Sequence, residues 1–238
     1  MLRKVLHALR EEIADCFPKK SARLSYSQAG EDMIVDFIFK ALRVSKPNYL
    51  DIGAHHPYQF SNSYYFYLQG CRGVAVEPDP DLFRLFVQKR RNEIHLNVGV
   101  GAETSHELPF YIMSTPTLNT FSGSEAVKYE QTGFHKIVRV ENVQVITISE
   151  IFDKYFSRSS PDFLSIDVEG LDFEIIKSID FEKYRPCVIC VETITFSENR
   201  EEKKLVAIPA YLESRGYMVY ADTYINTIFV DRARWESR

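Results

Sequence analysis

Two apolar runs decide the fold of this chain: YLDIGA at Tyr49–Ala54 and VAVEP at Val74–Pro78. Each run meets a carboxylate near its end, as a buried parallel strand does when it surfaces at its carboxyl end. The stretch between them has the length of one helix, so the unit is predicted as strand–helix–strand. An acid and a glycine ending the first strand, with an acid ending the second, indicate a nucleoside-cofactor site in a doubly wound α/β sheet.

The bulk composition excludes several classes of protein. A chain of 238 residues suits one large domain, or one domain with an added arm. A formal charge of −4 without a long basic run argues against a nucleic-acid partner. No apolar stretch reaches the roughly 18 residues of a membrane span. The N-terminal residues lack the uninterrupted apolar region of a signal peptide.

The cysteines point to a reducing compartment. Cys187 and Cys190 have the C-x-x-C spacing of redox and zinc sites, but they fall within the apolar run Pro186–Val191, which is predicted as a strand. Alternation along that strand would turn the two sulfurs to opposite faces and prevent chelation. We therefore expect buried structural cysteines and a cytoplasmic protein.

Residues 1–44 are predicted as an N-terminal helical arm and residues 45–238 as the main domain. Leu2–Phe17 carries a helical apolar stripe, and Ser27 is a candidate N-cap for a second helix that runs to about Leu42. Beyond Asn48 strands and helices alternate, which predicts parallel pairing. Strands are predicted at 48–52, 73–77, 94–98, 162–167 and 186–192, and helices at 61–69, 80–91, 172–179 and 201–214.

The C-terminal part departs from this alternation. Tyr217–Tyr220 and Asn226–Val230 are predicted as two strands of a hairpin, so a mostly parallel seven-stranded sheet should include an antiparallel C-terminal strand. That ending distinguishes the Rossmann-like fold of class I methyltransferases from a plain dinucleotide-binding fold.

An irregular segment at about 106–148 is predicted as an insertion that caps the mouth of the pocket. It holds two strand-like runs that enclose Thr117, Leu118, Asn119 and Thr120. Their hydroxyl and amide groups favour contact with a glycosyl hydroxyl.

Four motifs together resemble the FkbM family of S-adenosylmethionine-dependent methyltransferases. They are YSQAGED at Tyr26–Asp32, LDIGAHH at Leu50–His56, VEP at Val76–Pro78 and DFLSIDVEG at Asp162–Gly170. The resemblance runs from about Tyr26 to Val230. It implies a class I fold, S-adenosylmethionine as cofactor, and O-methylation of a hydroxyl of a sugar, a glycan or a related metabolite. It also implies that Gln28 closes over the cofactor.

The chain departs from the common family pattern at Pro57, where a second glycine is usual. Proline has no amide hydrogen, so this loop cannot offer the same donors to the cofactor. His55, His56 and the Ser61–Ser63 stretch must therefore shape the loop differently.

The candidate cofactor-binding residues follow the first three strands. Asp51 is expected to organise the donors around the methionine end and Gly53 to let the backbone approach; the alternative for Asp51 is a helix cap. Glu77, followed by the turn at Pro78, is placed to accept hydrogen bonds from two vicinal ribose hydroxyls. Asn97 and Val98 follow the third strand, where the adenine ring is held in this fold.

The candidate catalytic residues are two carboxylates and two histidines. Asp167 and Glu169 end the fourth predicted main-sheet strand two residues apart, so both can point to one place. With Glu192 they form a candidate Mg²⁺ or Mn²⁺ site; alternatively, Asp167 braces the cofactor and Glu169 caps a helix. His55 and His56 are candidate bases, but adjacent residues diverge, so at most one should face the pocket.

Two other classes of function stay open from the residues alone. An NAD-dependent oxidoreductase lacks support because no G-x-G-x-x-G run is present. A cofactor-binding protein without catalysis is disfavoured because the acids at positions 51, 77, 167 and 169 occur together.

Overall fold

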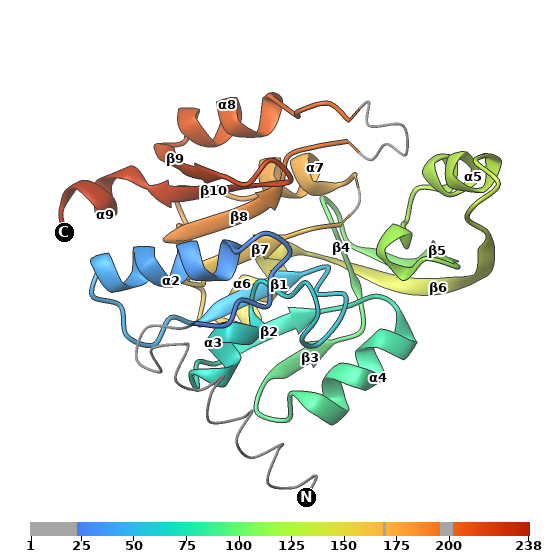
Figure 1. Cartoon of the computed structure of the whole chain (residues 1–238), viewed down its shortest axis with the longest axis horizontal. Coiled ribbons are helices and arrows are strands. Elements are labelled where there is room, and N and C mark those ends of the chain that lie inside the picture. Colours follow the sequence, from blue (N-terminus) through green and yellow to red (C-terminus); the bar gives the residue numbers. More distant parts are fainter. Residues whose placement is uncertain (1–22, 169, 196–201) are drawn as a thin grey trace, which may run out of the picture.

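A computed structural model describes residues 23–168, 170–195 and 202–238, so the predicted helix at Leu2–Phe17 lies outside the described residues. The main sheet has seven strands in the order β3-β2-β1-β7-β8-β10-β9. The strands are β1 (Tyr49–Ile52), β2 (Gly73–Val76), β3 (Ile94–Leu96), β7 (Phe163–Ile166), β8 (Val188–Glu192), β9 (Tyr217–Asp222) and β10 (Asn226–Asp231). β10 is antiparallel to both β8 and β9, and the pairs from β3 to β8 are parallel. The predicted sheet, with its antiparallel C-terminal strand, is confirmed (Figure 1).

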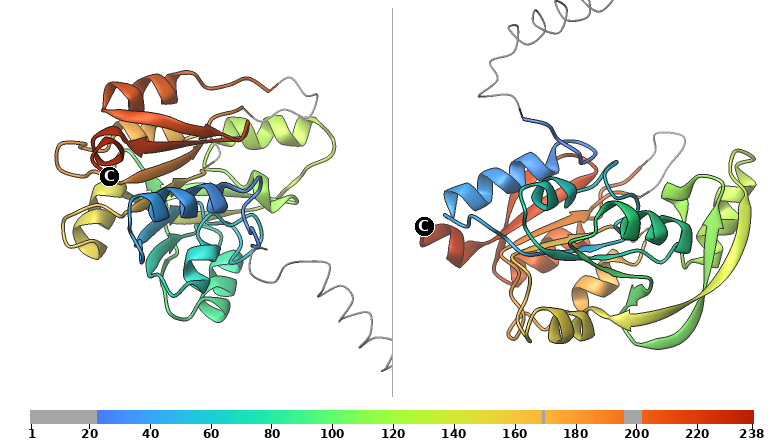
Figure 2. Two further views of the ribbon diagram at one scale, coloured as in Figure 1. Left: turned by 60° about the vertical axis from the view of Figure 1, so that its left-hand side comes forward. Right: turned by 90° about the horizontal axis from the view of Figure 1, so that it is seen from below.

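Helices cover both faces of this sheet. On one face lie α2 (Glu31–Ala41), α3 (Tyr64–Leu68), α4 (Pro80–Lys89) and α9 (Arg232–Glu236). On the other lie α6 (Ile148–Tyr155), α7 (Asp172–Lys177) and α8 (Ala207–Ser214). Figure 2 shows the two layers edge-on.

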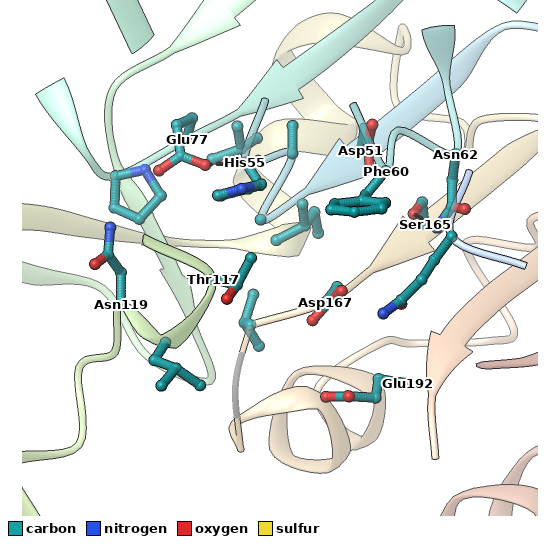
Figure 3. Close-up of a pocket in the computed structure, with 18 of the residues that line it drawn as sticks. Asp51, His55, Phe60, Asn62, Glu77, Thr117, Asn119, Ser165, Asp167 and Glu192 are labelled. Carbon is teal, nitrogen blue, oxygen red and sulfur yellow. Dashed lines mark hydrogen bonds between the residues drawn. The ribbon is translucent and has the colours of Figure 1, made fainter. Parts of the chain in front are cut away.

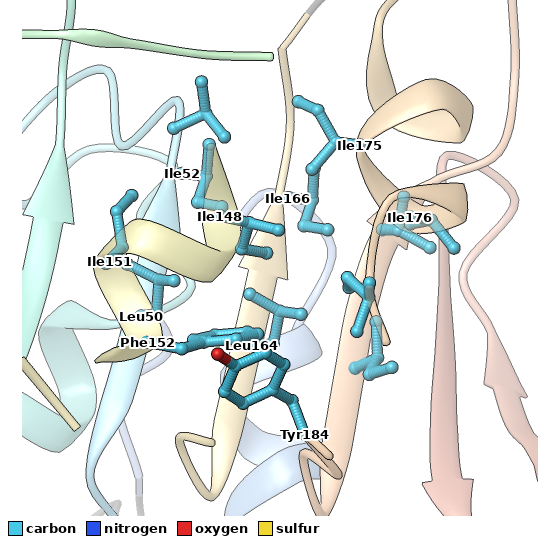
Figure 4. Close-up of a cluster of buried hydrophobic side chains, with 14 of the residues drawn as sticks. Leu50, Ile52, Ile148, Ile151, Phe152, Leu164, Ile166, Ile175, Ile176 and Tyr184 are labelled. Carbon is cyan, nitrogen blue, oxygen red and sulfur yellow. The ribbon is translucent and has the colours of Figure 1, made fainter. Parts of the chain in front are cut away.

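Alternation along β1 divides its side chains between the two layers. Leu50 and Ile52 pack in the large apolar cluster with α6 and α7 (Figure 4). Tyr49 packs in the opposite cluster with α2 and α3, so Asp51 also faces that side. All four residues of β1 are buried, which explains why the strand is apolar apart from its one acid.

The segment predicted as an insertion builds a second sheet. It contains β5 (Ser105–Met113), η1 (Pro116–Leu118), α5 (Gly123–Gln131) and β6 (Ile137–Thr147), and β6 also pairs with β4 (Gly99–Gly101). Arg139 of β6 forms an ion pair with Asp81 of α4 at 2.7 Å. The Asn119 amide donates to Asp79 at 3.0 Å. The segment is thus fixed beyond the carboxyl ends of the parallel strands (Figure 1).

Two local signals explain where helices begin. Asp79 caps α4 by accepting from the amide of Asp81, and Pro80 occupies the first turn. Thr147 and Glu150 form a capping box at the start of α6, a helix that the prediction did not include. α8 begins at Ala207 rather than near residue 201, because residues 202–206 are not helical.

The two neighbouring cysteines are buried, but the face argument was wrong. Cys187 lies just before β8, outside the alternating strand, and both Cys187 and Cys190 pack in the cluster with α2. Both are free thiols, and burial raises the pKa of Cys190 well above its usual value. They are structural residues, as predicted.

In the part of the chain that the structure describes, every helix is too short or too polar to cross a lipid bilayer.

Candidate functional site

A cavity of about 580 Å³ opens beyond the carboxyl ends of β1, β2, β7 and β8. Its walls also include Val98 to Val100, the η1 segment of the insertion, and the turn between β9 and β10. Figure 3 shows Glu77 and His55 on one side of this space and Asp167 and Glu192 on another. Parallel sheets place ligands at such a crevice.

Glu77 is held in one orientation at the end of β2. Its side chain is buried, and one carboxylate oxygen accepts from the amide of Asp79 at 2.8 Å while the other accepts from the amide of His55 at 2.7 Å. Burial raises the pKa of Glu77 to about 8, and the two amide bonds oppose that shift. Each oxygen keeps a lone pair free. The carboxylate can therefore accept from a pair of hydroxyls.

Asp51 is tied to the protein through a serine. The hydroxyl of Ser63 donates to Asp51 Oδ2, and Arg90 Nη2 donates to the Ser63 hydroxyl at 3.0 Å. Burial raises the pKa of Asp51, whereas the bond from Ser63 and the charge of Arg90 oppose the rise. The orientation of Asp51 thus depends on Arg90 through one intermediate hydroxyl.

Arg90 is fully buried, which the sequence did not indicate. It forms an ion pair with the buried Glu93 side chain at 2.6 Å and donates to the Tyr49 hydroxyl at 3.1 Å. The rings of Tyr67 and Phe86 lie with centroids 5.1 and 5.3 Å from its guanidinium carbon. The only local signal was the i,i+3 spacing of Arg90 and Glu93, which is as common on exposed helices.

Gly53 is required by the backbone around it. Its φ is +73°, and a Cβ at this position would lie 1.7 Å from the carbonyl oxygen of Asp167. Glycine therefore lets the end of β1 meet the end of β7. The close approach to a ligand that the sequence predicts stays a prediction; the approach that the structure shows is to Asp167.

Asp167 lines the cavity immediately after β7. Its amide donates to Ile52 at 3.0 Å, but none of the described residues donates a hydrogen bond to its carboxyl group. Burial, and then the negative charges of Asp172, Asp51 and Glu31, raise the pKa of Asp167 to about 7. A carboxyl group with these properties can take up a proton near neutral pH.

Glu192 and Asn226 lie side by side across β8 and β10. They are register partners on the antiparallel strands, and both line the cavity. Asn226 Nδ2 donates to Glu31 at 3.1 Å, which fixes the orientation of the amide. Its Oδ1 is buried and has no donor among the described residues. The sequence analysis did not single out Asn226, because nothing in its surroundings marks it as a functional residue.

Comparison with known proteins identifies the family. The FkbM methyltransferase domain matches residues 51–219, which is most of the chain. The chain belongs to the FkbM methyltransferase family. No curated protein matches it.

Solved structures with a similar backbone fold include other methyltransferases, all at low sequence identity. A TehB-like SAM-dependent methyltransferase from Corynebacterium glutamicum is 11% identical with a TM-score of 0.44, over 97% of this chain and 98% of that one. A precorrin-6y C5,15-methyltransferase from Geobacter metallireducens is 14% identical with a TM-score of 0.41, over 90% and 94%. A 1,6-didemethyltoxoflavin-N1-methyltransferase from Burkholderia thailandensis, with bound S-adenosylhomocysteine, is 10% identical with a TM-score of 0.37, over 88% and 91%.

Of the remaining cofactor candidates in this FkbM chain, three line the cavity and one does not. Gln28, Pro78 and Val98 contribute to its walls. Asn97 is exposed and does not, because its amide donates to the carbonyl groups of Glu77 and Pro78, each at 2.9 Å. Asn97 therefore braces the turn that carries Glu77.

The two histidines diverge, as the sequence predicted. His55 lines the cavity with a φ of +53°, and burial lowers the pKa of its imidazole. His56 does not line the cavity. Its Nδ1 accepts from the amide of Gln59 at 3.2 Å. His55 stays a candidate base, and His56 holds the loop.

The candidate metal site cannot be assembled from the described residues. Asp167 and Glu192 face the same space (Figure 3), and Glu169 lies outside the described residues. Within the described ranges no group of three histidine, cysteine, aspartate or glutamate side chains has the geometry of a metal site.

In the loop after β1, Pro57 stands where a second glycine was expected, and the contacts of the loop differ accordingly. Arg90 Nη1 donates a hydrogen bond to the carbonyl oxygen of Pro57 at 3.4 Å. Phe60 is 63% exposed, with a φ of +54°. Asn62 donates to the Ser165 hydroxyl at 3.2 Å, which holds the loop over the end of β7. Phe60 and Asn62 both line the cavity.

Three of the residues predicted to contact the acceptor lie in the cavity wall: Thr117 and Leu118 in η1, and Asn119 directly after it. Thr117 faces the open space in Figure 3. Asn119 is already bonded to Asp79 and to the amide of Met113. Thr120 is buried and accepts from the amide of Ser122 instead.

Proposed function

We propose that the protein is an S-adenosylmethionine-dependent O-methyltransferase acting on a hydroxyl of a sugar, a glycan or a related metabolite. The observation that carries this proposal is the pair formed by Glu77 and Asp167 in one cavity. Glu77 is oriented to accept a ribose diol, and Asp167 is a carboxyl group with a raised pKa and free acceptor capacity. Under this proposal residues 45–238 form the catalytic domain, with 106–148 inserted and 1–44 as an arm.

The charge of the cavity fits this methyl donor. Among the described lining residues five carry carboxyl groups and none is a lysine or an arginine. S-adenosylmethionine carries a sulfonium and an ammonium against one carboxylate, so acids around it are favourable. The pyrophosphate of NAD would meet repulsion here, and the loop containing Pro57 lacks the glycine-rich amides that bind it.

The residues divide the work of the reaction. When bound, S-adenosylmethionine supplies a methyl group on a sulfonium, which is already electrophilic. Glu77 holds the ribose hydroxyls, while Asp51, kept in place by Ser63 and Arg90, and Gly53 surround the methionine end. Pro78 and Val98 flank the adenine ring, and Gln28 closes the cavity from the side of α2. Their contribution is alignment and exclusion of water.

Asp167 is our candidate for removing the proton of the acceptor hydroxyl, with His55 as the alternative. A carboxylate is a weak base for an alcohol, so we retain Mg²⁺ or Mn²⁺, bound by Asp167, Glu169 and Glu192, as a candidate means of acidifying the hydroxyl. Exhaustive chelation would then stop turnover, leave donor binding intact, and be reversed by either ion. Full activity in chelator would eliminate the metal version.

Calorimetric titration with S-adenosylmethionine, S-adenosylhomocysteine and NAD tests the proposal directly. We expect binding of the first two and none of NAD. Binding of NAD alone would overturn the proposal. A methyl-transfer assay with neutral sugars, oligosaccharides, catechols and polyketides then tests the acceptor class, and activity restricted to catechols would contradict it.

The acidic lining of the cavity supports a small-molecule or glycan acceptor rather than nucleic acid. The buried free thiols of Cys71, Cys187 and Cys190 support a cytoplasmic location.

A further inference from the structure

One aromatic side chain in the cavity wall is left largely uncovered by the protein. Among the described residues, the phenylalanines and tyrosines that line the cavity are Phe60, Phe110, Phe121 and Tyr224. Phe110 is buried and packs against Phe121, with the ring centroids 4.7 Å apart. The Tyr224 hydroxyl donates to Glu202 at 3.1 Å. Phe60 is the most exposed of the four, at 63%, so its ring is the one most open to a ligand.

The backbone of Phe60 is strained and is held in place by the residues that follow it. Its φ is +54°, a region that residues other than glycine rarely occupy. The amide of Ser61 donates to the carbonyl group of Tyr26 at 2.9 Å. Asn62 donates to the Ser165 hydroxyl at 3.2 Å. Strain of this kind persists only where the surrounding contacts impose it, and it gathers at ligand-binding sites.

These contacts bring the ring of Phe60 beside Asp51. Ser165, to which the loop is bonded, is the register partner of Asp51 on the neighbouring strand β7. In Figure 3 the Phe60 ring lies next to Asp51, on the side that faces Asp167. Under the proposed function, Asp51 belongs to the methionine end of the donor and Asp167 to the hydroxyl that receives the methyl group. The sulfur that carries this methyl group joins the two places, so the sulfonium is expected at the ring.

An aromatic ring face suits a sulfonium better than a hydrogen-bond acceptor does. A sulfonium carries a full positive charge but has no N–H or O–H group to donate. The face of an aromatic ring is the negative part of its quadrupole and attracts a cation without a hydrogen bond. The described residues that line the cavity include no lysine or arginine that would compete for this ring.

We propose that the ring face of Phe60 binds the sulfonium of the methyl donor and thereby raises the affinity for S-adenosylmethionine relative to that for S-adenosylhomocysteine. This inference rests on the proposed function and adds to it a residue that distinguishes the donor from its product. S-adenosylhomocysteine has lost the methyl group and the positive charge with it, so the ring attracts it less. The site therefore favours fresh donor over spent product, which limits inhibition by the product.

Calorimetry on the full chain tests the inference in the absence of an acceptor, so that the donor is not consumed. The dissociation constants of S-adenosylmethionine and S-adenosylhomocysteine are measured for the unsubstituted protein and for Phe60→Leu. Leucine keeps an apolar side chain without a ring face, and the exposed position should tolerate it. We expect the affinity for S-adenosylmethionine to fall about 3- to 30-fold and that for S-adenosylhomocysteine to change less than about twofold.

Two further variants locate the effect in the ring of Phe60. Phe60→Tyr keeps a ring face, so the ratio of the two dissociation constants should stay close to that of the unsubstituted protein. Phe134→Leu is the matched control, because it removes an exposed phenylalanine that does not line the cavity. It should leave both affinities unchanged.

The outcomes separate this inference from the proposed function. Equal losses of affinity for the two ligands in Phe60→Leu would make the ring an apolar wall and overturn the inference. Two unchanged affinities would leave the ring to the acceptor and overturn it as well, as would a Phe60→Tyr variant that behaves like Phe60→Leu. In these cases the unsubstituted protein still binds both ligands and the proposed function stands. Failure of the unsubstituted protein to bind either ligand would instead remove the proposed function itself.

Discussion

The two ends of the cavity treat their polar groups differently. At the β1–β2 end the protein donates hydrogen bonds to the carboxylates. The Ser63 hydroxyl donates to Asp51, and two backbone amides donate to Glu77. At the β7–β10 end the Asp167 carboxyl group and Asn226 Oδ1 have no donors among the described residues. Side chains that the protein already orients suit the methyl donor, which is the same in every turnover. Hydrogen-bond acceptors that the protein leaves unused suit the methyl-accepting substrate and the proton that it loses. We therefore expect substitutions at the first end to change cofactor affinity and substitutions at the second to change turnover.

The largest effect should come from Asp167→Asn. The amide cannot take up the acceptor proton, so kcat should fall about 10²–10⁴-fold, the usual contribution of a general base. Affinity for S-adenosylhomocysteine, measured by calorimetry, should change little, because Asp167 does not belong to the carboxylates of the β1–β2 end, where the cofactor is proposed to bind.

Glu174→Gln is the control, since Glu174 lies on the neighbouring helix α7 and pairs there with Lys177. Normal turnover in Asp167→Asn would assign the proton transfer to another residue, and His55→Gln would be the next variant to measure.

The next largest effect should come from Arg90→Met, which removes the cation that supports the first end. The variant would leave Glu93 buried without the charge of Arg90 and would remove the hydrogen bond that Arg90 donates to Ser63. The free energy of unfolding should therefore fall by about 3–5 kcal/mol. Denaturant unfolding with intrinsic fluorescence measures this. Arg90→Lys should recover part of the loss.

Arg84→Met gives a matched comparison, because Arg84 also pairs with an acid in an i,i+3 arrangement but on an exposed surface. We expect little change there. Similar losses in both variants would mean that the buried network around Arg90 has no special role.

The sequence predicted the carboxylates of the site better than it predicted their support. The four carboxylates lie at or just beyond the carboxyl ends of apolar strands, and the ends of parallel strands meet at one edge of a sheet. They are Asp51, Glu77, Asp167 and Glu192. That rule brought all four to one cavity, although their roles remain predictions. Arg90 was missed because its burial depends on rings from α3, which no local pattern announces.

Two further differences have local causes. α6 was missed because the alternating pattern of β6 continues into Ile148, where the capping box of Thr147 and Glu150 was the better signal. Asn97 was predicted to bind the cofactor from its place after β3, but its amide is used by two carbonyl groups. The position of a residue along a strand predicts the edge of the sheet at which it lies. The direction of its side chain depends on the groups that it contacts in the folded protein.

A smaller effect, on affinity alone, should follow from Glu77→Ala. Loss of a charged acceptor for the ribose hydroxyls should weaken binding of S-adenosylhomocysteine by about 1.5–3 kcal/mol. Calorimetry measures the change, with Glu182→Ala as the exposed control. Unchanged affinity would remove the ribose assignment and, with it, the main difference between the two ends.

The last prediction concerns a dependence of stability on pH that belongs to Glu77. Because its pKa is raised to about 8 from 4.5, the folded protein binds more protons than the unfolded chain between these values. The contribution of Glu77 to the free energy of unfolding therefore decreases as the pH rises from about 4.5 to 8. Glu77→Gln lacks this titration, so its stability relative to the unsubstituted protein should rise with pH across the window.

Binding of S-adenosylhomocysteine needs the ionised carboxylate, so affinity should rise by at most about tenfold per pH unit below pH 8. Asp167 also titrates in this range, but it is present in both proteins, and the difference isolates Glu77. Equal pH profiles of stability for the two proteins would show that Glu77 is ionised throughout, held by its two amide bonds.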